Sequence, residues 1–181
     1  MTRIIAGTYG GRRLQTPPGD GTRPTSDRVR EAMFSSLQSE LGGFDGLRVL
    51  DLFAGSGALG LEALSRGAAR ADFVESNARA ASVIKRNIAE LGAAGHVHRS
   101  SVERFVVDLS HGPFGLVFID PPYAVTTEQV AAIVADVSRQ TADPDALIIV
   151  ERSSRDPFAW PEGVDALRDK PYGDTHLWYG R

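Results

Sequence analysis

The sequence of 181 residues contains no cysteine. Disulfides, thiolate metal ligands and cysteine nucleophiles are therefore excluded, and the composition is compatible with a reducing cytoplasm. No apolar run approaches the roughly 20 residues that are needed to cross a bilayer. Residues 1–14 also lack the apolar core and cleavage site of a signal peptide. We therefore expect a cytoplasmic protein with no membrane-bound segment.

Histidine is scarce as well, and its four copies are badly placed for holding a metal. His96 and His98 alternate within a predicted strand, whereas His111 and His176 lie far apart along the chain. Their spacing does not match that of a zinc site, in which ligands come in closely spaced pairs. We expect no metal.

The net charge is small, at −3, but positive and negative residues are unevenly distributed along the chain. Residues 1–30 carry six arginines against two aspartates, which gives +4 and leaves −7 on the rest of the chain. The arginines are Arg3, Arg12, Arg13, Arg23, Arg28 and Arg30. A basic arm on an acidic body predicts a polyanion partner for the arm. The alternative is a solvated hairpin with surface arginines.

The hydrophobic content of 42% and the absence of low-complexity segments indicate a single globular domain. Residues 3–15 are typical of two short strands around a Gly-Gly turn, and 16–24 form a turn-rich linker. A helix is predicted over 27–41, capped by Thr25 or Ser26 and ended by a glycine pair.

From residue 48 onward, apolar strands alternate with helical segments. Strands are expected at 48–53, 71–75, 96–100, 115–120 and 146–151. The spacings Ser100–Glu103 and Thr126–Gln129 match capping boxes for two of the helices. Such alternation predicts an α/β fold with a parallel sheet covered on both faces. The last residues predict two antiparallel strands with a turn at 172–174.

The first of these strands leads into the glycine loop "DLFAGSGALG", in which Gly55, Gly57 and Gly60 match G-x-G-x-x-G. Glycines allow a tight turn and close backbone approach, and the following helix N-terminus favours ligand binding. Glu75 ends the next strand, where a carboxylate can accept both hydroxyls of a ribose. The loop therefore predicts a nucleoside-containing cofactor. A purely structural strand-helix turn is the alternative.

Asp51 favours S-adenosylmethionine over a dinucleotide. A carboxylate buried within a strand costs several kcal/mol if it is left unpaired, and a cationic ligand offsets that cost. S-adenosylmethionine carries an ammonium and a sulfonium, whereas the pyrophosphate of a dinucleotide would be repelled. The alternative role for Asp51, which is compatible with the first, is to accept hydrogen bonds from amides of the glycine loop.

The stretch "DPPY", residues 120–123, follows the fourth strand of the parallel unit. Ligands bind beyond the carboxyl ends of parallel strands, so this stretch is expected beside the cofactor. Its prolines restrict the backbone and remove amide donors, which leaves carbonyls and the Asp120 side chain as acceptors. Rigid acceptors suit an –NH₂ group, and Tyr123 offers a face for a stacked base. A rigid strand-to-loop turn is the alternative.

These features predict methyl transfer to an exocyclic amine of a nucleobase. Such an amine is a poor nucleophile, because its lone pair is delocalised into the ring. Acceptors on its N–H groups favour the pyramidal nitrogen of the transition state, and alignment with the sulfonium methyl adds proximity. Methylation at cytosine C5 by the usual route needs a thiolate, which this chain lacks.

The motifs "DLFAGSG", "FVES" and "DPPY", in this order, resemble those of S-adenosylmethionine-dependent amino-methyltransferases. The blocks "RIIAGTYGGRRLQTP" and "RPTSDRVREAMFSSL" narrow the resemblance to the RsmD-type methyltransferases, which modify guanine N2 in 16S ribosomal RNA. The resemblance spans nearly the whole chain. It implies a Rossmann-like class I methyltransferase fold, with a seven-stranded, mostly parallel sheet and an antiparallel strand near one edge. We expect residues 1–22 to form an N-terminal hairpin extension and 23–181 the methyltransferase domain.

The resemblance also implies roles for residues. The target amine would be held by Asp120 and the Pro121 carbonyl, within a segment that continues through Pro122 to Tyr123. The cofactor would contact Asp51, Phe53, Ala54, Gly55, Ser56, Gly57, Glu75 and Ser76. Many relatives in the superfamily carry an acidic residue after the third strand for the adenine; here Ser101 and the Val102 amide are the candidates. The six arginines of the arm would touch 16S ribosomal RNA, in the small subunit or an assembly intermediate, and we expect a monomer.

Three other functions stay open at this stage. A DNA amino-methyltransferase would use the same chemistry, although such enzymes usually carry a larger recognition insert. An NAD-binding oxidoreductase has only the glycine loop in its favour. A non-catalytic RNA-binding module would make the "DPPY" segment dispensable.

Overall fold

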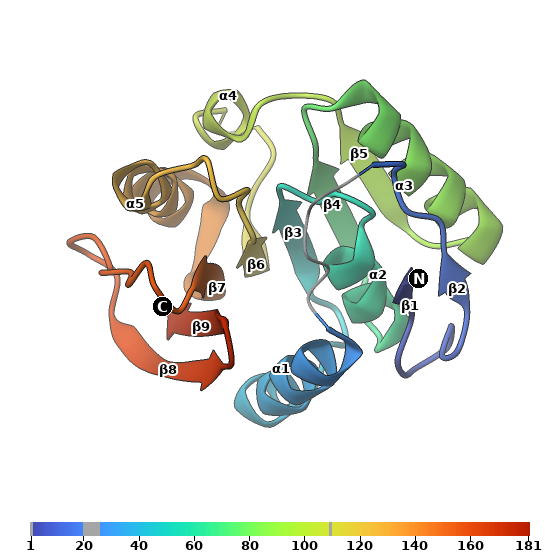
Figure 1. Cartoon of the computed structure of the whole chain (residues 1–181), viewed down its shortest axis with the longest axis horizontal. Coiled ribbons are helices and arrows are strands. Elements are labelled where there is room, and N and C mark those ends of the chain that lie inside the picture. The colour runs from blue at the N-terminus through green and yellow to red at the C-terminus, as the bar shows by residue number, and fades with distance from the viewer. Residues whose placement is uncertain (1, 20–25, 109) are drawn as a thin grey trace.

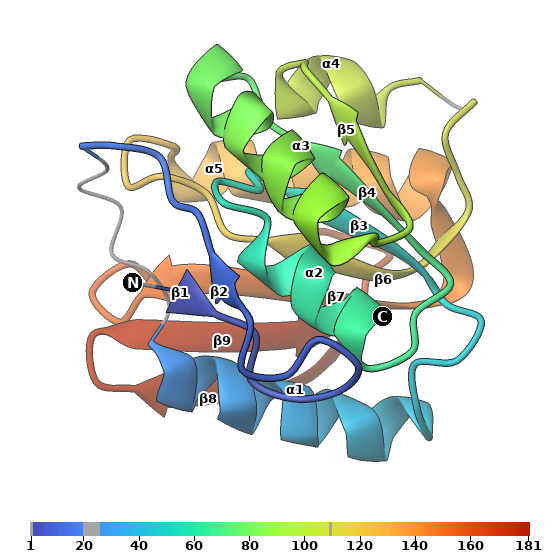
Figure 2. The same ribbon diagram turned by 90° about the vertical axis from the view of Figure 1, so that its right-hand side faces the viewer.

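The computed structural model describes residues 2–19, 26–108 and 110–181. Within these, one seven-stranded sheet has helices on both faces, and a two-stranded sheet lies beside it (Figures 1 and 2). The large sheet has the order β5-β4-β3-β6-β7-β9-β8. Its strands are β3 (Arg48–Leu52), β4 (Arg70–Val74), β5 (Gly95–His98), β6 (Phe114–Ile119), β7 (Ala142–Ser153), β8 (Ala166–Tyr172) and β9 (Thr175–Gly180). The helices are α1 (Asp27–Leu41), α2 (Ala58–Ser65), α3 (Ala78–Leu91), α4 (Val102–Val106) and α5 (Thr127–Asp136), which continues into a π-helical turn, η1 (Val137–Thr141).

The predicted parallel sheet is confirmed. Strands β3 to β7 pair in parallel, and β9 runs antiparallel to both of its neighbours, β7 and β8. The chain proceeds outward from β3 to β5 and then returns to place β6 on the other side of β3. The direction of winding therefore reverses between β3 and β6, which is the position where open α/β sheets bind their ligands.

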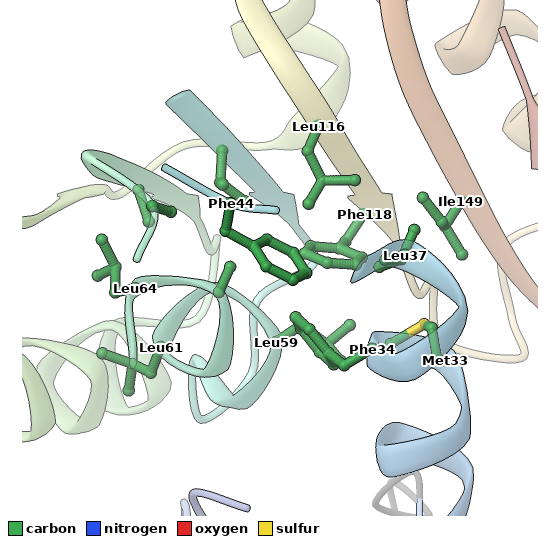
Figure 3. Packing of buried hydrophobic residues seen from close by; sticks show 14 of the residues in the cluster. Met33, Phe34, Leu37, Phe44, Leu59, Leu61, Leu64, Leu116, Phe118 and Ile149 are labelled. Carbon is green, nitrogen blue, oxygen red and sulfur yellow. The ribbon is translucent and has the colours of Figure 1, made fainter. Parts of the chain in front are cut away.

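Hydrophobic side chains fill both faces of the sheet, because successive residues of a strand point to opposite sides. Leu116 and Phe118 of β6 pack with Phe34 of α1 on one face (Figure 3). Val117 and Ile119 join the cluster under α4 and α5 on the other face. Strands covered on both faces are continuously apolar, as the sequence of β6 is.

The N-terminal hairpin is confirmed as a two-stranded antiparallel sheet of β1 (Thr2–Arg3) and β2 (Arg13–Leu14). Its connection is longer than the expected Gly-Gly turn. The buried carboxylate of Glu62 on α2 fixes the hairpin by accepting hydrogen bonds from the amides of Ile5 (2.7 Å) and Ala6 (3.1 Å). A buried carboxylate with well-formed hydrogen bonds is strongly orienting. The expected boundary between residues 22 and 23 lies outside the described residues.

The helix ends follow the sequence with one exception. Ser26 caps α1, Gly42 ends it in the left-handed conformation, and Thr126 forms the predicted capping box with Gln129. At α4 the prediction of a Ser100–Glu103 box was wrong. Ser101 is the cap there and accepts from the Arg104 amide at 3.3 Å. A cap position depends on where the backbone turns into the helix, so neighbouring serines compete for it.

Candidate active site

A cleft of about 610 Å³ opens at the carboxyl ends of β3, β4, β6 and β7, where the sheet reverses its winding. It brings together the residues predicted from the glycine loop, from the end of β4 and from the "DPPY" segment. Those that line it are Asp51, Phe53, Ala54, Gly55, Ser56, Glu75, Ser76, Asp120, Pro121, Pro122 and Tyr123. Gly57, Ser101 and Val102 are not among its lining residues, and the Ser101 hydroxyl is engaged in capping α4.

The glycine loop between β3 and α2 has an unusual backbone. Phe53 has a φ of 57°, a left-handed conformation that is rare for a bulky residue and is often found at functional sites. A Cβ atom on Gly60 would lie 2.4 Å from the Phe73 ring, so the third glycine permits α2 to pack against the sheet. A Cβ on Gly55 would meet no protein atom within 4 Å. The loop backbone at Gly55 is therefore open to a ligand.

Glu75, just after β4, faces this loop. Its Oε2 accepts a hydrogen bond from the Gly55 amide at 3.0 Å, and its Oε1 accepts one from the Asn77 amide at 2.8 Å. A carboxylate has about four acceptor positions, so each oxygen keeps capacity for a second donor. The two backbone bonds fix the carboxylate at the cleft wall.

Asp51 is buried beneath the loop, and its Oδ2 accepts a hydrogen bond from the Gly60 amide at 2.9 Å. The structural role considered for this residue is therefore present. Burial raises the pKa of Asp51 to about 8; the Gly60 bond lowers it in part, and the charge of Glu75 raises it further. A single hydrogen bond does not repay the desolvation of the charge. The site therefore favours a cationic ligand group that would hold Asp51 ionised.

Asp120 follows β6 and lies in the same cleft. Burial raises the pKa of Asp120 well above its usual range, and the negative charges of Glu151 and Asp51 raise it further. Several carboxyl groups thus crowd one wall of the cleft. Crowded acids of this kind are found at functional sites more often than elsewhere in proteins.

The segment after Asp120 is held in a tight turn. The Val125 amide donates to the Pro122 carbonyl at 3.0 Å, whereas the Pro121 carbonyl accepts no hydrogen bond from the residues that the structure describes. The Tyr123 side chain lines the cleft and is 71% exposed. The lining of the cleft thus includes a residue with a free carbonyl and an uncovered aromatic ring.

Two residues of β7 complete this wall, and sequence reasoning missed both. Glu151 and Arg152 line the cleft because β7 lies next to β6. Arg152 is buried; it donates to the Val125 carbonyl at 3.0 Å and pairs with Asp156. The sequence places both residues at the end of the strand that follows "DPPY". Only the order of strands in the sheet shows that this end of β7 lies beside the end of β6.

The N-terminal extension forms the opposite side of the cleft through Thr2, Thr16 and Pro17. The buried side chain of Asn87 on α3 holds this segment. Its Nδ2 donates to the carbonyls of Gln15 and of Ser56 in the glycine loop, each at 3.0 Å. Its Oδ1 accepts from the Gln15 amide at 2.9 Å. One amide group therefore ties the extension to the glycine loop.

The arginines predicted to bind RNA differ in their exposure and in their contacts. Arg30 does not belong to an exposed arm, because its side chain is 1% exposed and donates to the Arg3 carbonyl (2.5 Å) and to Asp27 (2.9 Å). It lines the cleft, and its contact with RNA stays a prediction. Arg3 is exposed but pairs with Asp27 at 3.2 Å. Arg12, Arg13 and Arg28 are exposed, and Arg23 lies outside the described residues.

Among residues 2–19, 26–108 and 110–181, no group of three or more His, Cys, Asp or Glu side chains is arranged to hold a metal ion. Within the same part of the chain, no helix has the length and apolar character that a membrane crossing requires.

Solved structures share this architecture. The protein yhhF from Escherichia coli superposes with a TM-score of 0.83 and 33% identity, covering 99% of this chain and 97% of that one. The precorrin-6y C5,15-methyltransferase of Geobacter metallireducens has a TM-score of 0.66 over 93% of both chains, at 15% identity, and shows the fold alone. The sheet with its reversed strand β9, and the cleft between a glycine loop and an Asp-Pro-Pro-Tyr segment, define a Rossmann-like methyltransferase.

Sequence comparison gives the family. The family model described as Conserved hypothetical protein 95 matches residues 2–181. A Haemophilus influenzae protein named Ribosomal RNA small subunit methyltransferase D is 35% identical, covering 94% of this chain and 89% of the relative. The Escherichia coli protein of that name is 43% identical over 122 residues, 67% of this chain and 60% of the relative. The chain belongs to this family, the RsmD-type methyltransferases, and the oxidoreductase alternative is therefore set aside.

Proposed function

We propose that this protein transfers a methyl group from S-adenosylmethionine to the exocyclic N2 amine of a guanine in small-subunit (16S) ribosomal RNA. The observation that carries the proposal is the meeting of two groups of residues in one cleft. Asp51 and Glu75 form a site for a cationic nucleoside, and Asp120 with the Pro121 carbonyl forms a site for an amine. The names of the relatives support ribosomal RNA as the substrate.

The residues of the cleft fit S-adenosylmethionine. Glu75 is oriented by two backbone amides and keeps acceptor capacity for the ribose hydroxyls. Asp51 is a buried acid that gains from a cationic partner. The open face of Gly55 allows a ligand to approach the backbone. When bound, S-adenosylmethionine supplies the electrophilic methyl carbon on its sulfonium sulfur.

In our proposal, Asp120 and the Pro121 carbonyl accept the two N–H groups of the guanine amine. These hydrogen bonds orient the nitrogen lone pair toward the methyl carbon. S-adenosylmethionine, when bound, would supply the methyl group that N2 accepts, and Asp120 would take the proton that N2 releases. The environment that raises the pKa of Asp120 makes its carboxylate, once it is ionised, a stronger base than an exposed aspartate. No covalent enzyme intermediate is needed.

The target nucleotide has to leave its stack to reach this cleft. The exposed ring of Tyr123 offers a surface for the displaced base, and stacking of this kind contributes about 1–3 kcal/mol. An unpaired guanine in a ribosomal RNA loop costs less to present than a base in a duplex. This supports RNA over DNA as the acceptor. We further propose that the protein acts in the cytoplasm as a monomer.

Transfer of a labelled methyl group tests the proposal. The purified protein would be given methyl-labelled S-adenosylmethionine with one of three acceptors: small ribosomal subunits that lack the modification, naked 16S ribosomal RNA, or duplex DNA. We expect label in ribosomal material, and the better of the two ribosomal acceptors identifies the form of RNA that is recognised. Label in DNA alone would overturn the RNA assignment. No transfer to any acceptor, with the cofactor bound, would overturn the catalytic assignment.

A further inference from the structure

A second, shallower groove of about 390 Å³ lies along the outer side of α3. We call it the α3 groove; its lining residues are Pro18, Ala78, Arg79, Ser82, Val83 and Arg86. The N-terminal extension forms one side of it, and two turns of the helix form the other. Figures 1 and 2 show β2 and the segment that follows it next to α3.

The α3 groove adjoins the active-site cleft. Pro17 and Asn77 line the cleft, and the next residues in the chain, Pro18 and Ala78, line the groove. The two hollows therefore share their border at the start of α3. A chain that leaves the cleft on this side passes directly over the groove.

The groove is positively charged. Arg79 and Arg86 are exposed and have no carboxylate partner among the described residues. They lie seven positions apart, close to two helical turns, and therefore project from the same face of α3. Along α3 the only acid is Glu90, whose side chain accepts from Gln15 and whose carbonyl accepts from Arg12. Arg12 of the hairpin thus contacts the last turn of the same helix.

We propose that the α3 groove binds phosphates of the RNA strand that flanks the target nucleotide, with Arg79 and Arg86 as the contacting residues. The inference rests on the proposed function and extends it to a path for the substrate. Unpaired guanidinium groups are the side chains best suited to phosphate oxygens. Arg3 and Arg30, in contrast, each pair with Asp27, which offsets part of the charge expected from the N-terminal arm.

The salt dependence of RNA binding tests this proposal. Affinity for an RNA fragment that the wild-type protein methylates would be measured at several salt concentrations for Arg79→Gln with Arg86→Gln. Each phosphate contact with single-stranded RNA contributes about 0.7 to the slope of log K against log salt, so the slope should fall by about 1.4. Relative to equal binding at 1 M salt, affinity at 0.1 M salt should fall roughly 25-fold, with cofactor affinity unchanged.

A matched control removes the same charge elsewhere. Arg139→Gln with Lys170→Gln changes one residue of η1 and one of β8, the strand at the far edge of the sheet. This pair should leave the slope as in the wild type, and Arg79→Lys with Arg86→Lys should restore it. An unchanged slope in the groove variant of a protein that methylates RNA would overturn the α3 groove alone. A wild-type protein that bound no RNA would overturn the proposed function as well.

Discussion

Arg152 donates a hydrogen bond to the Val125 carbonyl at 3.0 Å, and through it β7 holds the segment that carries Asp120 to Tyr123. A second hydrogen bond, from the Val125 amide to Pro122, closes the turn. Arg152 is therefore placed to fix the position of the amine-binding residues without touching the amine itself.

Replacing Arg152 by Gln should release this segment. We expect kcat to fall by about 10- to 100-fold, because small displacements of reacting groups cost this much. Cofactor affinity, measured by calorimetry, should stay within about threefold of the wild type. Arg152→Lys, which keeps the positive charge and a donor nitrogen but loses the planar fork, should recover part of the rate. Equal losses of kcat and cofactor affinity would mean that Arg152 supports the whole cleft rather than this segment.

Asp120→Asn should remove the negative charge and the base, and replace one acceptor oxygen by an NH₂ donor, while keeping the shape of the side chain. We expect kcat to fall at least about 100-fold, the usual effect of losing a group that stabilises the transition state. Glu128→Gln, an exposed acid at the start of α5, serves as the control. Turnover of Asp120→Asn near the wild-type level, under single-turnover conditions, would rule out the role of Asp120.

Binding of the cofactor should depend on pH through Asp51. The free protein keeps this group protonated below a pKa of about 8. A cationic ligand binds best to the ionised form. Affinity should therefore rise as pH increases toward 8, by up to about tenfold per pH unit, and level off above that. Calorimetry from pH 6 to 9 in buffers of different ionisation enthalpy would detect the released proton.

The variant Asp51→Asn should lose this pH dependence and bind the cofactor weakly throughout.

The stability of the free wild-type protein should fall over the pH range in which its cofactor affinity rises. The unfolded chain ionises Asp51 above about pH 4, so the contribution of this group to the free energy of unfolding is lost as pH rises toward 8. Cofactor affinity that is flat across the range in the wild type would contradict the assignment.

Tyr123→Ala should affect RNA and not the cofactor. Loss of about 1–3 kcal/mol of stacking corresponds to weaker RNA binding by roughly 5- to 150-fold. Tyr123→Phe keeps the ring and should bind RNA like the wild type. The ring is exposed in the protein, so neither change should lower the melting temperature. An Ala variant with wild-type RNA affinity would show that the ring does not receive a base.

The sequence predicted the part of the molecule that depends on local pattern. Alternation of strands and helices indicated the parallel sheet, and motifs at three strand ends indicated which residues share the cleft. Glu151 and Arg152 depend on β7 lying next to β6, which is long-range pairing that no local pattern shows. The burial of Arg30 could be predicted from its position in the helix. It stands one turn before Phe34 on the buried face of α1, and the net charge of a segment does not show on which face of a helix an arginine lies.

At the cap of α4, the local sequence does not decide between two neighbouring residues. Ser100 and Ser101 are neighbours, and both stand before a short helix. Their local sequence signals are almost the same, and the path of the backbone after β5 decides between them. The adenine contact assigned to Ser101 and Val102 depends on that same turn, and it stays a prediction.

The central claim concerns one atom, the guanine N2, held by Asp120 and the Pro121 carbonyl. The most direct test is mass spectrometry of nucleosides from 16S ribosomal RNA methylated by the wild-type protein, with Asp120→Asn in parallel. We predict N2-methylguanosine from the wild type and almost none from the variant. A methyl group on a ring nitrogen, a carbon or a ribose oxygen would contradict the account.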